Sequence, residues 1–310
     1  MAIQEHHVTL PALPGRRAKT SIASPEDYAV CRQIMRAASK NYSFSSNFLP
    51  AEKLHHVEAL YAFLRVGDDR VYVSHQGFQS PLAAIDDWER AYWRAFDVGD
   101  SPDPVMRAYV NTAAECGIPR ETMTTYFRAM KDDLTVSRFP TFDDLIYYME
   151  GSAIPVGRAM TFILGVRPPY TLEDALPGAD SLSVAMQLSN FWRDIGHDLA
   201  VIGRIYLPQQ DMERFRYSEQ DLAARLVNAN FIELLEFEFE RTERYYDHAR
   251  ESVKMLADGR LGVMSGLEIY RAILSGIRRN NYDVFTQHAA ASKIQKLSLV
   301  SKAGWQVVWE

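Results

Sequence analysis

The sequence contains little cysteine, and its glycines and prolines leave long segments between them. Its two cysteines, Cys31 and Cys116, are too few for a disulfide framework and lack the spacing of a metal site, so reduced thiols are expected. The 16 glycines and 14 prolines are too sparse for the frequent turns of a β-sandwich or barrel. We therefore expect an all-helical chain.

The chain also lacks an excess of positive charge and long hydrophobic runs. Its formal net charge is −6, whereas a protein that neutralises several phosphates needs a basic surface, so no nucleic-acid partner is expected. No segment approaches the roughly 18 apolar residues of a membrane span, and the first residues contain no apolar run typical of a signal peptide. These absences predict a cytoplasmic location.

The apolar content is sufficient for a large core, because 47% of the 310 residues are hydrophobic. Residues 1–20 contain two prolines and a Gly-Arg-Arg sequence without sustained periodicity, and we expect them to form a flexible extension. Residues 21–310 are expected to form a single all-α domain of long helices packed around a central space.

Helix start signals recur along the chain. Ser24 and Pro25 combine an N-cap with a proline at the first helical position, and Thr141 begins another capping sequence. Apolar periodicity supplies the remaining boundaries. Helices are predicted over residues 24–38, 50–73, 101–116, 119–134, 141–165, 172–200, 218–229, 231–257 and 260–280, and from about residue 291.

Two aspartates in an apolar segment carry the strongest functional signal. Asp194 and Asp198 are four residues apart, so a helix places them on one face, and Asn190 and Gln187 extend that polar face. At ~6 Å and an effective dielectric constant near 20, the two charges repel by about 3 kcal/mol. A hard cation such as Mg²⁺, which binds carboxylate and phosphate oxygens, fits between them. The alternative is a solvated face with Arg193 as the partner, which the surrounding apolar residues disfavour.

A second acidic cluster lies earlier in the chain. Arg65 and Asp68 share a helix face, and Tyr61 lies one turn before Arg65. Helix-borne acids that face each other across a bundle, each backed by an arginine, form a site for metal-chelated diphosphate. Alone, an Asp-Asp-Arg triplet is typical of surface charge, so its interpretation depends on the later motif.

The order and spacing of these motifs resemble the squalene/phytoene synthase family, the head-to-head trans-isoprenyl diphosphate synthases, from about residue 28 to residue 300. The resemblance implies an all-α isoprenoid synthase fold with a central active-site cavity. The matching segments are residues 39–42, 60–65, 133–138, 148–157, 187–198, 203–208, 267–274 and 281–285.

The resemblance also implies a reaction. Two allylic prenyl diphosphates, farnesyl or geranylgeranyl, join head to head through a cyclopropyl diphosphate to give a C30 or C40 product of carotenoid or hopanoid biosynthesis. The implied cofactor is Mg²⁺, for which Mn²⁺ could substitute, and the sequence does not decide whether NADPH reduces the product. Nor does it decide whether the protein is a monomer or a dimer.

Site residues follow from the same resemblance, position by position. Asp68, Asp194 and Asp198 would hold the metal. Arg65 and Arg193 would contact diphosphate. The reacting centre would be lined by Ser39, Tyr42, Tyr61, Tyr148, Gln187, Asn190 and Tyr270, of which Tyr148 and Tyr270 are the aromatic candidates for catalysis.

One departure from the family pattern affects the first acidic motif. The family has a second aspartate four residues after the first, but Tyr72 occupies that position and Asp69 lies on a different face. Asp69 or a water could substitute, the first ionisation could be altered, or the chemistry could be lost. Two alternatives stay open: a terpene cyclase or hydrolase that uses one prenyl diphosphate, and a catalytically silent assembly or binding protein.

The C-terminal stretch from Lys293 to Lys302 is basic and amphipathic, and tryptophans follow it. A helix docked on the domain is one interpretation. Peripheral contact with a membrane surface is the other, which would suit delivery of a hydrocarbon product into lipid.

Overall fold

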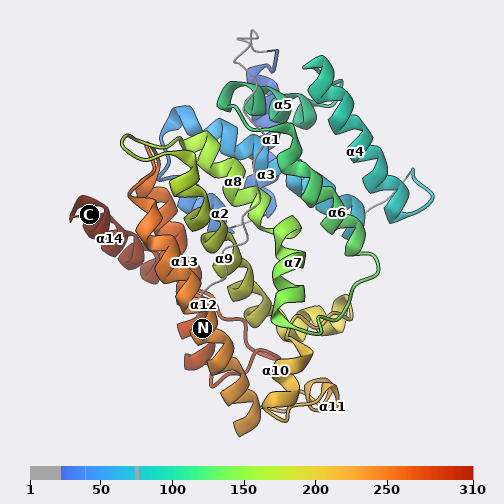
Figure 1. Ribbon diagram of the computed structural model, residues 1–310, viewed down its shortest axis with the longest axis vertical. Coiled ribbons are helices and arrows are strands. Elements are labelled where there is room, and N and C mark those ends of the chain that lie inside the picture. Colours follow the sequence, from blue (N-terminus) through green and yellow to red (C-terminus); the bar gives the residue numbers. More distant parts are fainter. Residues whose placement is uncertain (1–21, 39, 74–76, 310) are drawn as a thin grey trace.

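A computed structural model describes residues 22–38, 40–73 and 77–309 of the protein (Figure 1). These residues form an all-α fold without β-strands, apart from one isolated bridge between Val166 and Leu256. The predicted fold class is confirmed, whereas the predicted extension at residues 1–20 lies outside the described residues. The elements are α1 (Pro25–Ala38), α2 (Lys40–Ser46), α3 (Ala51–Tyr72), α4 (Pro81–Val98), α5 (Pro104–Cys116), a 3-10 turn (Arg120–Met123), α6 (Thr124–Asp132), α7 (Phe142–Ser152), α8 (Ile154–Leu164), α9 (Leu172–Val201), α10 (Gln209–Arg214), α11 (Glu219–Ala223), α12 (Ala229–Val253), α13 (Arg260–Arg279) and α14 (Lys293–Trp309).

Helix α9 is the central element, and it packs against α8, α12 and α13 (Figure 1). A capping box begins it: the Thr171 backbone N–H donates to Asp174 Oδ2 at 2.8 Å, and the Asp174 N–H donates to Thr171 Oγ1 at 3.3 Å. Its 30 residues span about 45 Å at 1.5 Å per residue. No helix in the described part of the chain is long and apolar enough to cross a membrane.

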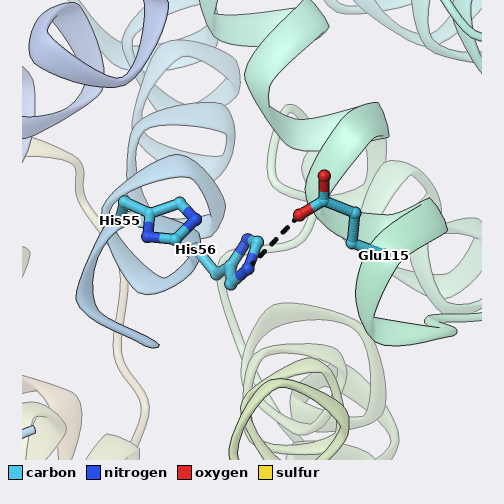
Figure 2. A group of neighbouring side chains, drawn as sticks. All are labelled: His55, His56 and Glu115. Atoms are coloured by element: carbon cyan, nitrogen blue, oxygen red, sulfur yellow. Dashed lines mark ion pairs between the residues drawn. The ribbon is translucent and has the colours of Figure 1, made fainter. Parts of the chain in front are cut away.

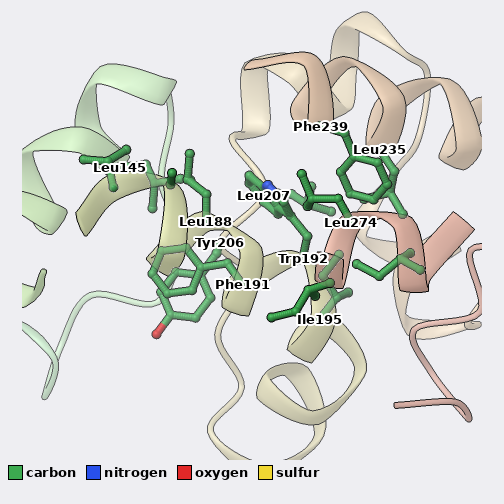
Figure 3. Packing of buried hydrophobic residues seen from close by; sticks show 14 of the residues in the cluster. Leu145, Leu188, Phe191, Trp192, Ile195, Tyr206, Leu207, Leu235, Phe239 and Leu274 are labelled. Atoms are coloured by element: carbon green, nitrogen blue, oxygen red, sulfur yellow. The ribbon is translucent and has the colours of Figure 1, made fainter. Parts of the chain in front are cut away.

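One core cluster holds the apolar face of α9 against its neighbours (Figure 3). Trp192 is fully buried, and its Nε1–H donates to Thr242 Oγ1 of α12 at 2.9 Å, so burial leaves no polar atom of the indole unpaired. Phe191 stacks on Tyr206 with ring centroids 3.7 Å apart. These contacts fix the rotation of α9 and turn its polar face away from α12.

A second core cluster fixes α3 against α4, α5 and α6. Phe63 stacks on Tyr109 with centroids 4.2 Å apart. Gly67 allows Tyr126 to approach closely, since a Cβ at this position would lie 2.0 Å from the tyrosine oxygen. The Tyr126 hydroxyl instead donates to the Leu64 carbonyl at 2.9 Å. This packing sets the direction of the polar residues in the second half of α3.

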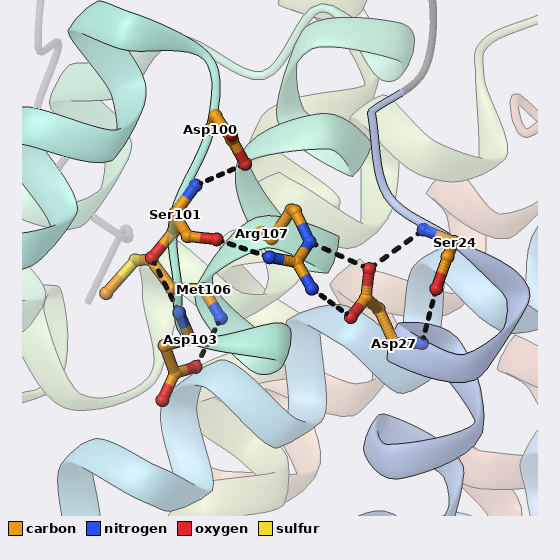
Figure 4. Close-up of polar contacts among 7 residues, drawn as sticks. All are labelled: Ser24, Asp27, Asp100, Ser101, Asp103, Met106 and Arg107. Atoms are coloured by element: carbon orange, nitrogen blue, oxygen red, sulfur yellow. Dashed lines mark hydrogen bonds and ion pairs between the residues drawn. The ribbon is translucent and has the colours of Figure 1, made fainter.

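A buried ion pair joins the start of α1 to α5 (Figure 4). The Arg107 guanidinium donates to both oxygens of Asp27, at 2.6 and 2.9 Å, and to the Ser101 carbonyl. Its hydrogen bonds hold the pKa of Asp27 below the usual value. The Ser24 N–H donates to the same carboxylate at 2.8 Å. Asp27 therefore both caps α1 and joins it to Arg107 of α5.

The structure corrects several predicted boundaries. Residues 141–165 form two helices, which break at Ala153, because Pro155 favours the first turn of a new helix over the interior of a long one. The helix predicted over residues 218–229 is only the short α11, and α12 begins at Ala229. The prediction missed α2, α4 and α10, although Ser80 and Pro81 give α4 the same start signal as the predicted helices.

Candidate active site

A cavity of about 430 Å³ lies between α2, α3, α8, α9, α12 and α13. Seven of the predicted site residues line it: Tyr42, Tyr61, Arg65, Asp68, Gln187, Asn190 and Tyr270. Most of the remaining wall is apolar and includes Leu49, Leu64, Val156, Met160, Leu164, Leu182, Met186, Val253, Leu256 and Val263. A pocket with apolar walls and a few convergent polar groups is typical of a small-molecule site.

The cavity is elongated along α9. Its lining runs from Ala175 to Asn190, a separation of about 22 Å at 1.5 Å per residue. Asp194 and Asp198 continue the same face one and two turns beyond Asn190, past the lining residues. The cavity therefore has an acidic end and a far end bordered by Ala175 and Gly178.

The Arg193 guanidinium engages both oxygens of Asp194, with Nε 2.8 Å from Oδ1. Burial raises the pKa of Tyr270. Tyr270 also lies close to this ion pair, so Arg193 lowers its pKa and Asp194 raises it by smaller amounts. Burial and the charge of Asp194 raise the pKa of Asp198 to about 6. Arg193 and Asp194, predicted to bind diphosphate and metal respectively, thus pair with each other.

Burial also raises the pKa of Asp68, to about 7, against the opposing effect of Arg65 and with smaller upward contributions from Asp133 and Asp69. Arg65 Nη2 pairs with Asp69 Oδ1 at 2.7 Å. Asp69 thus forms its ion pair with Arg65, one helical turn earlier.

Tyr72 contacts a carboxylate that the sequence analysis did not include in the site. Its hydroxyl donates to Asp133 Oδ2, and Arg204 Nη1 pairs with Asp133 Oδ1 at 2.9 Å. Arg204 Nη2 donates to the Asp133 carbonyl at 2.7 Å, and Nη1 donates to the Tyr206 hydroxyl at 2.8 Å. The charged side chains of this cluster are almost completely buried, with 4% of Arg204 and 1% of Asp133 exposed.

Arg204 links the two acidic motifs electrostatically. It lowers the pKa of Asp198 against the upward effect of burial. It also stabilises the negative charge of Asp133, and that charge raises the pKa of Asp68. Its backbone N–H also donates to the Asp198 carbonyl at 3.2 Å. The family-like segments at 133–138 and 203–208 were the only sequence signal for these residues, because no local spacing relates them.

The other predicted residues take distinct positions. The Tyr42 hydroxyl donates to Met160 Sδ at 3.3 Å, and its ring lies 5.0 Å from that of Tyr61. Tyr148 is buried outside the cavity lining, where its hydroxyl hydrogen-bonds to Asp133. Ser39 lies outside the described residues.

The donor set at this end consists of carboxylate oxygens. Asp68 and Asp198 hold their charge poorly here because burial and neighbouring acids destabilise it. An all-oxygen set of this kind suits Mg²⁺ or Mn²⁺. The residues that could hold such an ion are Asp68, Asp194 and Asp198.

An all-helical fold around an elongated apolar cavity with acids at one end defines an all-α isoprenoid synthase. Residues 35–295 match the family described as squalene/phytoene synthase, and the chain belongs to that family. It is accordingly an enzyme of the prenyltransferase class.

Relatives and solved structures agree with this assignment. The chain is 32% identical over 297 residues to a 15-cis-phytoene synthase of Synechococcus elongatus, covering 93% of this chain and 96% of the relative. A dehydrosqualene synthase solved with a ligand superimposes with a TM-score of 0.84 at 26% identity, covering 92% and 98% of the two chains. Squalene synthase HpnC of Alicyclobacillus acidocaldarius gives a TM-score of 0.73 at 31% identity, covering 83% and 95%.

Proposed function

We propose that the protein condenses two allylic prenyl diphosphates head to head, through a cyclopropyl diphosphate, to a C30 or C40 product in a Mg²⁺-dependent reaction. One observation carries this proposal: at one end of an apolar cavity about 22 Å long, Arg204 acts on Asp198 of α9 and pairs with Asp133, whose charge acts on Asp68 of α3. The names of the relatives, phytoene, dehydrosqualene and squalene synthase, support condensation of two prenyl groups.

The residues of the chain divide the work by position. Apolar walls hold the prenyl chains and keep water away from the carbocation that forms when diphosphate leaves. Arg65 and Arg193, which pair with Asp69 and Asp194, would exchange these partners for diphosphate oxygens and donate paired hydrogen bonds to them. Mg²⁺ held by Asp68, Asp194 and Asp198 would supply charge stabilisation for the leaving group.

Tyrosine rings line the cavity. Tyr42 and Tyr61 face each other in the cavity wall, and Tyr270 lines the wall beside Arg193. The negative face of an aromatic ring attracts a cation, most strongly where water is excluded. These rings would therefore stabilise the allylic and cyclopropylcarbinyl cations without acid–base chemistry.

The test is incubation of the protein with farnesyl or geranylgeranyl diphosphate, with Mg²⁺ and with or without NADPH, followed by mass analysis of the organic extract. We expect a C30 or C40 hydrocarbon from one of the two substrates and none when Mg²⁺ is omitted. A cyclic or alcohol product of unchanged carbon number would instead favour the single-substrate cyclase or hydrolase. Absence of any conversion would favour the silent binding protein.

We also propose that α14 contacts a membrane surface. This helix packs on α13 at the edge of the molecule (Figure 1), with Ala303 fully buried and Lys302 Nζ 3.0 Å from Glu268 Oε2. Its outer side exposes a row of apolar side chains, 59–81% accessible, beside further lysines. The row consists of Ile294, Leu297, Trp305 and Val308. An apolar row flanked by lysines is typical of helices that lie on anionic lipid.

Substitution of Ile294 and Trp305 by serine is expected to reduce sedimentation with phosphatidylglycerol vesicles several-fold without lowering the unfolding temperature, because both side chains are exposed. Val98→Ser removes an equally exposed apolar side chain from α4 and serves as the control. Equal sedimentation of the double variant and the unmodified protein, or no sedimentation of either, would leave α14 as a docked helix only.

A further inference from the structure

A second group of side chains of the types that ligate metals lies between α3 and α5 (Figure 2). His55 and His56 lie in the second turn of α3, and Glu115 lies in the last turn of α5. One ligand atom from each lies within 4.8 Å of the other two. His56 precedes Asp68 by 12 residues, about 18 Å along the helix, so this cluster is separate from the acidic end of the cavity.

Neighbours on α5 orient two of the three side chains. His56 Nδ1 lies 2.9 Å from Thr112 Oγ1, and Nε2 lies 3.6 Å from Glu115 Oε2. Asn111 Nδ2 donates to the other oxygen of Glu115 at 3.0 Å. The Thr112 hydroxyl can accept from Nδ1–H or donate to Nδ1, and the first arrangement leaves the lone pair of Nε2 directed toward the carboxylate. Hydrogen bonds of this kind set the tautomer and orientation of metal-binding histidines and carboxylates.

The ligand types of the cluster also suit a cation. Glu115 contributes a carboxylate, and the two histidines contribute imidazole nitrogens, which bind metals in their neutral form. The nearby cation Lys53 pairs with Asp258 at 3.7 Å. Glu115 is 37% exposed, so an ion and a water ligand can reach the cluster from solvent.

We propose that His55, His56 and Glu115 bind a Zn²⁺ ion that joins α3 to α5. Two imidazoles and one carboxylate form a ligand set typical of zinc, with water in the fourth position, whereas Mg²⁺ prefers oxygen ligands alone. Tyr28 of α1 packs edge-on against His55 with centroids 4.7 Å apart, so an ordered His55 also supports the contact of α1 with α3. The site would stabilise this corner of the fold and has no part in prenyl transfer.

The test is calorimetric titration of the chelator-treated protein with ZnCl₂ while millimolar Mg²⁺ occupies the acidic site. We expect one Zn²⁺ per chain and a rise in unfolding temperature on binding. His55→Gln and Glu115→Gln should weaken the affinity at least tenfold and remove that rise. Glutamine at position 115 keeps an acceptor for Asn111, so the zinc-free variant should unfold at the temperature of the unmodified protein.

Glu121→Gln, a change of an exposed acid in the neighbouring 3-10 turn, serves as the matched control and should bind zinc normally. The proposal is overturned if both cluster variants bind zinc as tightly as the unmodified protein, or if the unmodified protein binds none. Zinc binding that disappears in Asp194→Asn but persists in Glu115→Gln would also overturn it, since the ion would then occupy the acidic end of the cavity. None of these measurements depends on prenyl transfer.

Discussion

Asp198→Asn is expected to remove nearly all turnover of prenyl diphosphate, by roughly 100-fold or more, while the fold stays intact. The substitution removes a charged oxygen ligand from the acidic end of the cavity, and the affinity for a hard cation falls with the number of such ligands. Asp194→Asn should act in the same way, with the added loss of the partner of Arg193. Product formation at saturating Mg²⁺ is the measurement.

Stability separates a lost ligand from a damaged fold. Asp198 is partly buried and its charge is repelled by that of Asp194, so the neutral, similarly shaped asparagine relieves charge repulsion in the metal-free protein. We expect the metal-free variant to unfold at or above the temperature of the unmodified protein. Glu240→Gln, at an exposed position of α12, should change neither activity nor stability. Full turnover by either aspartate variant, or in the presence of a chelator, would contradict the metal role.

Tyr72→Asp is expected to lower the Mg²⁺ concentration needed for half-maximal rate, because it restores a carboxylate one turn after Asp68. In the unmodified protein the Tyr72 hydroxyl donates to Asp133, whose charge acts on Asp68. We therefore infer that Asp133 compensates in part for the missing carboxylate. Asp133→Asn should be severe alone and milder when combined with Tyr72→Asp, a non-additivity that a double-mutant cycle measures.

Asp69→Asn is the matched control for this pair of changes. Asp69 is paired with Arg65, so its loss should have a smaller effect than the loss of Asp133. A single-substrate cyclase predicts a different outcome, in which Tyr72→Asp scrambles or abolishes the product. If Tyr72→Asp changes neither Mg²⁺ dependence nor product, and Asp68→Asn is also harmless, the first motif holds no metal and head-to-head condensation loses its main support.

The parts of the site that local spacing determines were predictable. Asp194 and Asp198 share a face because four residues make about one helical turn, and the apolar residues beside them predicted a buried helix. Caps at Ser24 and Thr141 were recognisable for the same reason. Spacing did not determine the ion-pair partner of Arg65. It predicted that Arg65 shares a helix face with Asp68, and the structure shows that Arg65 forms its ion pair with Asp69.

The parts that depend on tertiary contact were not predictable from spacing. Arg204 and Asp133 are 71 residues apart, and only the packing of the segment after α9 against the end of α6 brings them together. Both charges of this pair are almost completely buried. Burying either charge without its partner would cost much free energy, so the two residues depend on each other. A sequence pattern contains neither the burial nor the partner.

The length of the cavity along α9 separates two properties of the enzyme. Charged groups gather beyond Asn190, whereas Ala175 and Gly178 border the far end, where a Cβ at Gly178 would lie 1.8 Å from Ser252 Oγ. Side chains at the far end lie away from the acids beyond Asn190. We therefore expect a larger or smaller side chain there to change the length of the molecule that fits the cavity without moving those acids. Under the proposed reaction, single substitutions at that end would therefore change product size while the reaction itself is preserved.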